Sequence, residues 1–448
     1  MKKKWKIILS VLAVLVIAIA GFVYYSYQAI YGSEEIEGKR EIIPSTNAEI
    51  TETEKGDADW PNWRGQYFDG KSSVTGIKTD WSEGLEKEWE ISFLCQGKQT
   101  ASWSAPVIAG KRLIIPGRDE KNDLVFCINA NTGELIWQGS YEAEAETAHG
   151  PGSRATPFID SNYVYTYGRS GDLVCWQLTD GKLIWRKNVN DFGGIAPSHG
   201  HSSSPLVYKD MVVVQGGGSA LIMAFNKFTG DLIWKSYEGL AGYAASTLVK
   251  TEEDTSFLVY HGKGLSCIET ETGKEHWRVP WENEMNATTP AIEDNIIFIS
   301  SFGMGEQFGG QAIEFTQDSY KILWKNDAIG AHHSDPIILD GYIYGYSGQS
   351  GRNKGDFKCL ELKTGKEMWS TKEIGQGTTS YVDDHLICMD LKGNLFLIKP
   401  NSKAFQLVSK FENALNEVKY QAWTVPVIAN GKLYLRYIQT LVCYDLMQ

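Results

Sequence analysis

The stretch Cys127-INANTGELI-Trp137 begins with a small residue, carries glycine at its seventh position and ends with tryptophan at its eleventh. The pattern returns in Cys175-WQLTDGKLI-Trp185, Ala224-FNKFTGDLI-Trp234, Cys267-IETETGKEH-Trp277 and Cys359-LELKTGKEM-Trp369. A weaker copy ends at Trp324, another runs from Leu397 to Leu407, and Trp89 stands upstream without a first half. Successive end positions lie 38 to 49 residues apart. A period of about 40 to 50 residues indicates propeller blades or a solenoid.

Each repeat contains four short runs that are typical of β-strands. In the third repeat, Ser203-Ser204-Pro205-LVY is followed by MVVVQ, ALIMAF, the turn KFTG and DLIWKS. Runs rich in β-branched and aromatic residues, separated by glycine or Asp-Gly turns, predict an antiparallel meander. Four such strands predict one propeller blade per repeat.

The repeated phrase is predicted to be structural. Its glycine suits a turn with positive φ, and its indole is expected to pack against the small first residue and the next blade. We therefore assign to the frame the tryptophans Trp89, Trp137, Trp185, Trp234, Trp277, Trp324 and Trp369. The small first position is a cysteine in five copies, namely Cys127, Cys175, Cys267, Cys359 and Cys443. Equivalent positions in neighbouring blades stand too far apart for a disulfide, so these are expected to be buried thiols.

The two ends of the chain indicate the number of blades. After the seventh repeat, residues 423–448 supply three strands and the first residues of another phrase, which include Cys443 and Asp445. The missing fourth strand is the upstream run around Trp89. The sequence thus predicts an all-β fold, namely an eight-bladed propeller of four-stranded blades. Strand exchange between the termini is expected to close the ring, so that no sheet edge remains free.

The N-terminus predicts a membrane anchor. Lys2, Lys3, Lys4 and Lys6 precede an uncharged apolar run from Ile7 to Tyr25, long enough to span a bilayer with the lysines in the cytoplasm. A cleaved signal peptide is the alternative, since Ala18-Ile19-Ala20 resembles a cleavage site. The expected organisation is a signal-anchor in residues 1–31, a flexible acidic tether in 32–58 and the propeller in 59–448. This places the propeller in the periplasm or outside the cell, anchored in the cytoplasmic membrane of a bacterial envelope.

Composition and motifs exclude several function classes. The 43 basic and 55 acidic side chains give a net charge of −12, and no basic stripe follows the N-terminus, so nucleic acid is not an expected partner. The sequence carries no phosphate loop, HExxH motif or Ser-His-Asp order. No catalytic residue is therefore assigned.

The repeats, in eight copies, resemble the pyrroloquinoline-quinone (PQQ) repeat family of propellers. The opening Asp59-Trp60-Pro61-Asn62-Trp63-Arg64-Gly65, followed by Asp69-Gly70, is similar to the start of many PQQ-like propellers. The family includes quinoprotein alcohol dehydrogenases, which hold the quinone with adjacent cysteines and a calcium ion, and the propeller lipoprotein of the outer-membrane barrel-assembly machinery. This chain has no adjacent cysteines and no long inserts. The resemblance is therefore greater to the assembly lipoprotein, although its lipid-bearing cysteine is missing here.

Residues that vary between blades suggest a binding site. Most inner strands are preceded by Ser/Thr-x-Pro or Thr-Pro, and the residues three and four positions before that proline differ from blade to blade. Such variation on a constant frame at one mouth of the channel is typical of a binding funnel. We predict that it is lined by Trp103, Arg154, His201, Tyr243, His332, His333 and Trp423. Trp103 and Trp423 form a candidate stacking platform and Arg154 a candidate anion or carbonyl ligand; the alternative is that these residues only fill the channel.

Two functions follow from these observations. The first is a membrane-anchored binding or scaffolding module, not an enzyme, whose partner is an envelope protein or a small molecule. The alternative is a PQQ-dependent quinoprotein dehydrogenase, for which PQQ and calcium would be cofactors. His149, His199, His201, His332 and His333 also precede inner strands, but without a fixed carboxylate they do not make a convincing metal site, and no metal is assigned.

Overall fold

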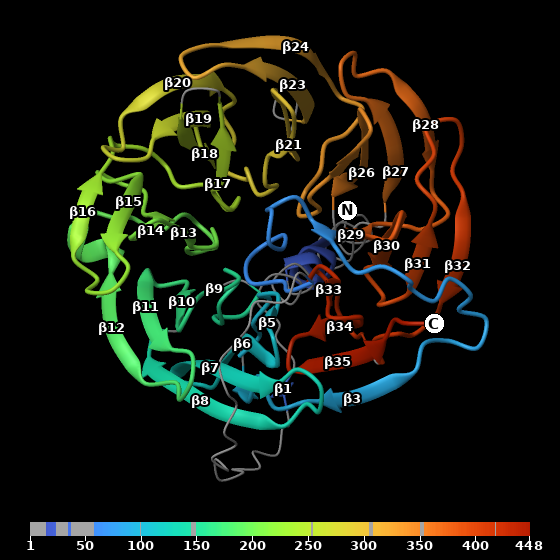
Figure 1. Cartoon of the computed structure of the whole chain (residues 1–448), viewed down its shortest axis with the longest axis horizontal. Coiled ribbons are helices and arrows are strands. Elements are labelled where there is room, and N and C mark those ends of the chain that lie inside the picture. The colour runs from blue at the N-terminus through green and yellow to red at the C-terminus, as the bar shows by residue number, and fades with distance from the viewer. Residues whose placement is uncertain are drawn as a thin grey trace, which may run out of the picture.

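Eight sheets stand around a central axis (Figure 1), each with four antiparallel strands, and one of them carries a short fifth strand in addition. This arrangement is that of a computed structural model, which describes residues 15–23, 35–36, 58–98, 100–144, 149–251, 254–303, 308–349, 354–416 and 418–448. In each sheet the first strand lies nearest the axis and the fourth at the rim, so the predicted four-stranded blade and all-β fold are confirmed.

The blades follow one another along the chain. Blade 1 contains β5 (Val107–Ala109), β6 (Arg112–Arg118), β7 (Asn122–Asn129) and β8 (Leu135–Glu142), and blade 2 contains β9 (Phe158–Asp160), β10 (Tyr163–Tyr167), β11 (Asp172–Gln177) and β12 (Leu183–Asn188). Blade 3 contains β13 (Leu206–Tyr208), β14 (Met211–Gln215), β15 (Ile222–Asn226) and β16 (Leu232–Lys235), and blade 4 contains β17 (Thr247–Lys250), β18 (Thr255–His261), β19 (Gly264–Glu269) and β20 (Glu275–Pro280). A 3-10 turn, η1 (Val189–Phe192), follows blade 2.

The second half of the chain continues the pattern. Blade 5 contains β21 (Ala291–Glu293), β22 (Ile296–Ser301), β23 (Gly309–Phe315) and β24 (Tyr320–Asn326), and blade 6 contains β25 (Ile337–Leu339), β26 (Tyr342–Gln349), β27 (Lys354–Glu361) and β28 (Glu367–Thr371). Blade 7 contains β29 (Gly377–Val382), β30 (His385–Asp390), β31 (Leu395–Ile398) and β32 (Leu407–Phe411). Blade 8 contains β33 (Val427–Ala429), β34 (Lys432–Tyr437) and β35 (Thr440–Asp445), and its outer strand is β3 (Lys87–Ile91), which pairs antiparallel with β35.

Three short strands lie outside this scheme. β2 (Lys71–Ser72) pairs parallel with the inner strand β29, and β1 (Glu35–Ile36) pairs with β4 (Gly97–Lys98). The predicted membrane span Ile7–Tyr25 lies partly outside the described residues, which contain its central part as a helix over residues 15–23. No helix in the described part of the chain has the length and apolar character needed to cross a membrane. Most of the predicted tether also lies outside the described residues.

The phrase tryptophans join each blade to the next, as the repeat predicts. Within a blade, the small first residue faces the tryptophan across the two outer strands, as in Cys127 with Trp137. The indole N–H then donates to a backbone carbonyl of the following blade. These bonds are Trp89 to Ala130 at 3.1 Å, Trp137 to Leu178 at 2.9 Å, Trp185 to Lys227 at 2.9 Å, Trp234 to Thr270 at 3.1 Å, Trp277 to Thr316 at 3.1 Å, Trp324 to Leu362 at 2.7 Å and Trp369 to Asn401 at 2.7 Å.

The phrase glycine is required by the tryptophan of the preceding blade. Gly133 has φ +75°, and a Cβ atom placed on it would lie 2.9 Å from the indole of Trp89. Gly230 stands in the same relation to Trp185, with a distance of 2.7 Å. Backbone conformation and lack of space thus both select glycine at this position.

The seventh copy of the phrase ends two residues later than the sequence spacing suggests. Leu397 pairs with Ser409, and Leu407 instead faces Ile398 across a register shift. The position equivalent to tryptophan is therefore Ser409, whose hydroxyl donates to the Thr79 carbonyl at 2.6 Å and accepts from the Trp81 amide N–H. A segment from before β3 thus covers the outer strand of blade 7, where the indole is missing.

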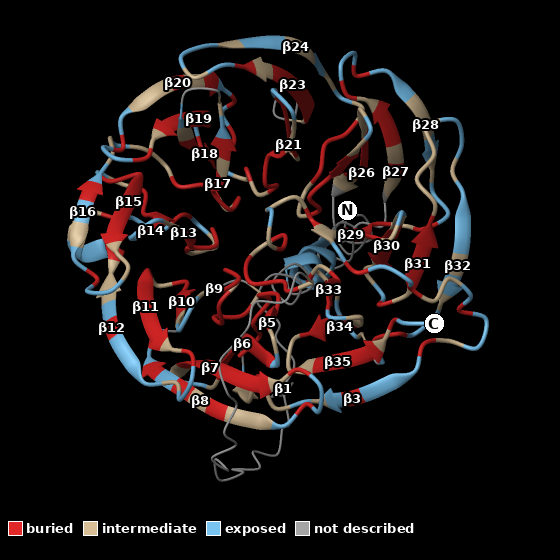
Figure 2. Cartoon of the chain, viewed as in Figure 1, coloured by how far each residue is buried: buried red, intermediate tan, exposed pale blue. Residues whose placement is uncertain are grey.

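Burial is greatest in the second and third strands of the blades and least at the rim. Figure 2 shows the second and third strands of the blades as mostly buried, and outer strands such as β12 and β32 as largely exposed. All seven cysteines are buried and unpaired, as the repeat register predicts for five of them. Burial raises the pKa of the Cys127 thiol to about 12, which keeps it protonated.

Replacing the phrase glycine tests the contact between blades. Gly133→Ala and Gly341→Ala should each lower the free energy of unfolding by about 1 kcal/mol, because both positions have a positive φ. Gly133→Ala should lose about 2 kcal/mol more, since its Cβ overlaps the Trp89 indole, whereas nothing lies within 4 Å of a Cβ at Gly341. Urea denaturation measures both free energies, and equal losses would contradict the proposed role of the contact.

Candidate functional site: the channel mouth and the plug

Two of the seven predicted funnel residues lie in direct contact at the channel mouth. The rings of Trp103 and Trp423 have centroids 4.6 Å apart and planes at 47°. Trp103 is 8% exposed and its N–H donates to the His149 carbonyl at 2.8 Å, while Trp423 is half-buried. The indoles of blades 1 and 8 are thus adjacent, as expected, but Trp103 lies beneath Trp423 and offers little free surface.

His149 and Tyr420 extend this aromatic group, although the sequence did not predict Tyr420. The Tyr420 hydroxyl lies 3.2 Å from His149 Nδ1, and the Tyr420 and Trp423 rings meet edge to face at 5.4 Å. His149 also stands edge to face with Trp423 at 5.3 Å. We call Trp103, Trp423, Tyr420 and His149 the mouth cluster.

The adjacent histidines of blade 6 reach the mouth cluster. The rings of His332 and His333 have centroids 3.7 Å apart, and His333 lies 5.6 Å from the Trp423 ring. Burial lowers the pKa of His332 to about 4, and burial, followed by the nearby His332 and Arg154, lowers the pKa of His333 well below its ordinary value. Both imidazoles are therefore neutral at physiological pH.

The mouth carries two guanidinium groups close to these rings. Burial, followed by the charge of Arg154, lowers the pKa of Arg169 to about 8, and burial lowers the pKa of Arg154 to about 10. Arg169 donates to the Gly150 and His199 carbonyls. The hydroxyls of Tyr243 and Tyr420 act in the opposite direction and raise the pKa of Arg154. The mouth therefore combines positive charge with aromatic rings.

Tyr243 and His201 have different positions. The Tyr243 hydroxyl accepts from the His199 amide N–H at 3.1 Å and lies 3.1 Å from the Ser198 hydroxyl, so it belongs to the rim of the mouth. His201 is only 1% exposed and packs on Tyr167 with ring centroids 5.1 Å apart. His201 is thus part of the interior of the propeller, and the structure does not bring it to the surface of the funnel.

The histidines do not assemble into a ligand set. Within the described ranges, the chain contains no group of three or more His, Cys, Asp or Glu side chains arranged to hold a metal ion. Asp335, the nearest carboxylate in sequence, is held by Arg64 at 3.2 Å and by the Thr289 amide at 2.8 Å.

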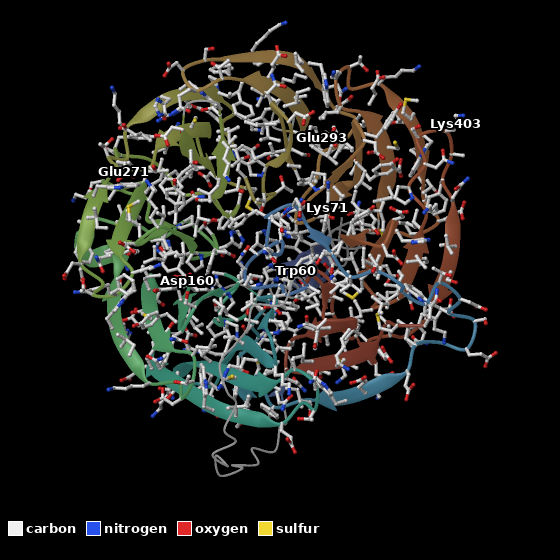
Figure 3. All side chains as sticks on the ribbon, viewed as in Figure 1. Trp60, Lys71, Asp160, Glu271, Glu293 and Lys403 are labelled. Atoms are coloured by element: carbon white, nitrogen blue, oxygen red, sulfur yellow. The ribbon has the colours of Figure 1, made fainter. Side chains whose placement is uncertain are left out.

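Residues 59–72 form a plug in the centre of the ring, which the sequence analysis did not predict. Figure 3 places Trp60 and Lys71 close to the axis. Trp60 exchanges two backbone hydrogen bonds with Ile108 of β5, at 2.8 and 3.0 Å, and is 1% exposed. The plug begins with the motif at Asp59 that supported the family resemblance. The two tryptophans and the arginine of this motif are the residues from which a buried position could have been predicted.

The plug is fixed to distant blades by polar contacts. Arg64 donates to the Pro336 carbonyl at 3.0 Å and pairs with Asp335, and both side chains of this ion pair are buried. The Trp63 N–H donates to Thr289 Oγ1 at 2.8 Å. Between the plug and Trp423 and His333 remains a cavity of about 20 Å³, large enough for about one water molecule. The central channel is thus filled by the plug on one side of this cavity and by Trp423 and His333 on the other.

This architecture defines the class of protein: an eight-bladed propeller built from PQQ-like repeats. The family model described as outer membrane protein assembly factor BamB matches residues 121–371, more than half of the chain. The chain therefore belongs to this family, in agreement with the resemblance of its repeats.

Individual comparisons agree with this assignment. The chain is 22% identical over 319 residues to outer membrane protein assembly factor BamB of Yersinia pestis, which covers 64% of this chain and 74% of the relative. The crystal structure of BamB from Moraxella catarrhalis matches 81% of this chain and 97% of its own, with a TM-score of 0.58 and 14% identity. Quinohemoprotein alcohol dehydrogenase from Comamonas testosteroni matches 87% of this chain and 81% of its own, with a TM-score of 0.62 and 13% identity. At these identities the solved structures show a common fold.

The mouth does not suit the quinone and calcium of the dehydrogenases. Calcium requires several oxygen ligands, and Asp335 is already engaged by Arg64 and Trp63. Trp103 is 8% exposed and its ring lies 4.6 Å from that of Trp423, so it offers little surface on which a flat ring could stack. We derive no redox step from this site.

His201 offers a test of the buried interior through pH. Its pKa is lowered from 6.5 to about 4 by burial, so between these pH values the unfolded chain binds a proton that the folded chain does not. The contribution of His201 to the free energy of unfolding should therefore be fully present above pH 6.5. It should fall by about 3 kcal/mol as the pH drops to 4. His201→Phe should remove that part of the decline in denaturation curves. An unchanged pH dependence would contradict the assigned burial.

Proposed function

We propose that this chain is an extracytoplasmic binding or scaffolding module that holds a protein partner of the cell envelope at the channel mouth. The observation that carries the proposal is the cationic and aromatic mouth, made of residues that differ between blades on a frame that repeats. The family supports it, because its relatives are named outer membrane protein assembly factors.

The chemistry of the mouth favours an acidic segment that contains an aromatic or apolar side chain. Trp423 is half-buried at the top of the mouth cluster, and Arg154 is half-buried beside it. Arg154 lowers the pKa of Arg169, so the two guanidinium groups lie close enough to act together on one anionic group. A small carboxylate ligand would bind to the same groups. The names of the family relatives favour a protein as the partner.

We further propose that the N-terminal run of residues 7–25 anchors the propeller in the cytoplasmic membrane, with residues 32–58 as a tether. The four lysines before it and its apolar composition support this orientation. The pairing of β3 with β35 supports our proposal that strand exchange between the two ends closes the ring.

Substitutions at the mouth test the binding function. Arg154→Ala and Trp423→Ala should each reduce at least tenfold the amount of envelope protein retained by the tagged full chain, because each removes a contact group from the mouth. Arg186→Ala is the matched control, since this arginine lies on the outer strand β12 and pairs with Asp172. Quantitative pull-down from detergent-solubilised envelopes measures retention. Equal retention by all three variants would refute the proposed site.

Reconstitution tests the dehydrogenase alternative. Full-length protein incubated with PQQ and calcium should show no dye-linked oxidation of alcohols or sugars above the protein-free control, because Trp103 is buried against Trp423 and Asp335 is engaged by Arg64. Oxidation that depends on both added components would overturn the assignment as a binding module.

A further inference from the structure

A second cavity lies at the plug end of the channel. Its volume is about 320 Å³, at the lower end of the range of ligand pockets, roughly 300–1,000 Å³. Its lining comes from the plug and from the inner strands of blades 4, 5 and 6: Arg64, Tyr67, Phe68, Asp69, Lys71, Thr247, Leu248, Val249, Lys250, Pro290, Ala291, Ile292, Asp294 and Ile338. None of these residues belongs to the mouth cluster.

The plug itself shows how inner strands accept additional chain. Ile108, the middle residue of β5, exchanges backbone hydrogen bonds with Trp60, and Ile159, the middle residue of β9, donates to the Pro61 carbonyl at 2.8 Å. On blade 7, the Tyr381 amide donates to the Gly70 carbonyl at 2.9 Å, next to the parallel pairing of β2 with β29. The plug thus adds backbone to the axial edges of blades 1, 2 and 7.

The equivalent edges of blades 4 and 5 face the cavity instead. Ile292 is the middle residue of β21, as Ile108 is of β5, so its N–H and C=O point toward the axis. On blade 4, Thr251 pairs with Asp254 at the hairpin, and the alternation of an antiparallel pair then directs Leu248 and Lys250 toward the axis. Among the described residues, these three have no hydrogen-bond partner on the axial side.

The cavity also offers side-chain contacts. The ring of Tyr67 is 69% exposed at its border, and Leu248 and Ile292 are half-buried in its wall. Its charges are mixed, with Lys71 and Lys250 opposed by Asp69 and Asp294. Such a lining does not select a strongly charged ligand. It fits main-chain hydrogen bonds together with one or two apolar side chains.

We propose that an extended segment of a partner protein binds here, adding to the inner edges of β17 and β21 in the manner in which the plug adds to β5, β9 and β29. Main-chain bonds to Ile292, Leu248 and Lys250 provide affinity, and the pocket beside Tyr67 receives an apolar side chain. This site is separate from the mouth and does not depend on the function proposed there.

Peptide selection provides the test. A displayed library of random twelve-residue peptides is selected on the full chain in detergent, and the enriched peptides are synthesised and their affinities measured by fluorescence polarisation. Ile292→Pro removes the axial N–H and keeps the pairing of β21 with β22, because proline is tolerated where the N–H faces away from the ladder. Val207→Pro makes the same change at the middle of β13 in blade 3, outside the cavity.

The expected result is affinity at least tenfold lower for Ile292→Pro and several-fold lower for Tyr67→Ala, with Val207→Pro and Arg154→Ala unchanged. Hydrogen exchange should show protection of the Ile292 amide by bound peptide. The proposal is overturned if no peptide is enriched, or if enriched peptides respond to Arg154→Ala and not to Ile292→Pro and Tyr67→Ala. A dimer of the chain that Ile292→Pro abolishes would assign the site to a second copy and also overturn it.

Discussion

The hydrogen bond from each phrase tryptophan to the next blade is the interaction on which the rest of the structure depends. Seven indoles donate to a backbone carbonyl of the following blade, and five of them also cover a phrase glycine there. Each bond contributes about 1 kcal/mol, and the buried indole surface adds more. Because this hydrogen bond recurs at seven of the eight junctions, and the segment containing Trp81 covers the outer strand at the remaining one, the inner strands meet around a common axis. The mouth and the plug both depend on that alignment.

The predictable part of the fold was the part that repeats. Tryptophan recurs because it meets the same kind of neighbour at seven blade junctions, and the phrase glycine because it lies against that tryptophan at five of them, so one sequence contained several independent copies of the same information. The phrase around Leu397 lacks a tryptophan, and its end was therefore misplaced by two residues relative to Ser409. Here the outer strand is covered by the segment containing Trp81, a contact that no repeat encodes.

The candidate site was predicted less completely. Residues before the inner strands were expected to line one mouth, and of these Trp103 and Trp423 are in contact. His201 stands four residues before its proline, one more than Trp103 and Trp423, and is buried against Tyr167. The plug was missed because Asp59 to Ser72 occurs once, and its partners Ile108, Asp335 and Tyr381 are far away in sequence. Its consequence is considerable, since it separates the channel into two ends with different chemistry.

The central claim is that the repeated tryptophans hold the frame and that the tryptophan of the mouth, Trp423, serves binding. The most direct test is a parallel measurement of unfolding free energy and partner retention for Trp277→Phe and Trp423→Phe, each of which keeps a ring but removes the indole N–H. Trp277→Phe should lose at least about 1 kcal/mol of stability, with the bond to Thr316, and retain the partner. Trp423→Phe should stay within about 0.5 kcal/mol of the parent and lose retention. The opposite pattern, or loss of both properties in both variants, would contradict the separation of frame from function.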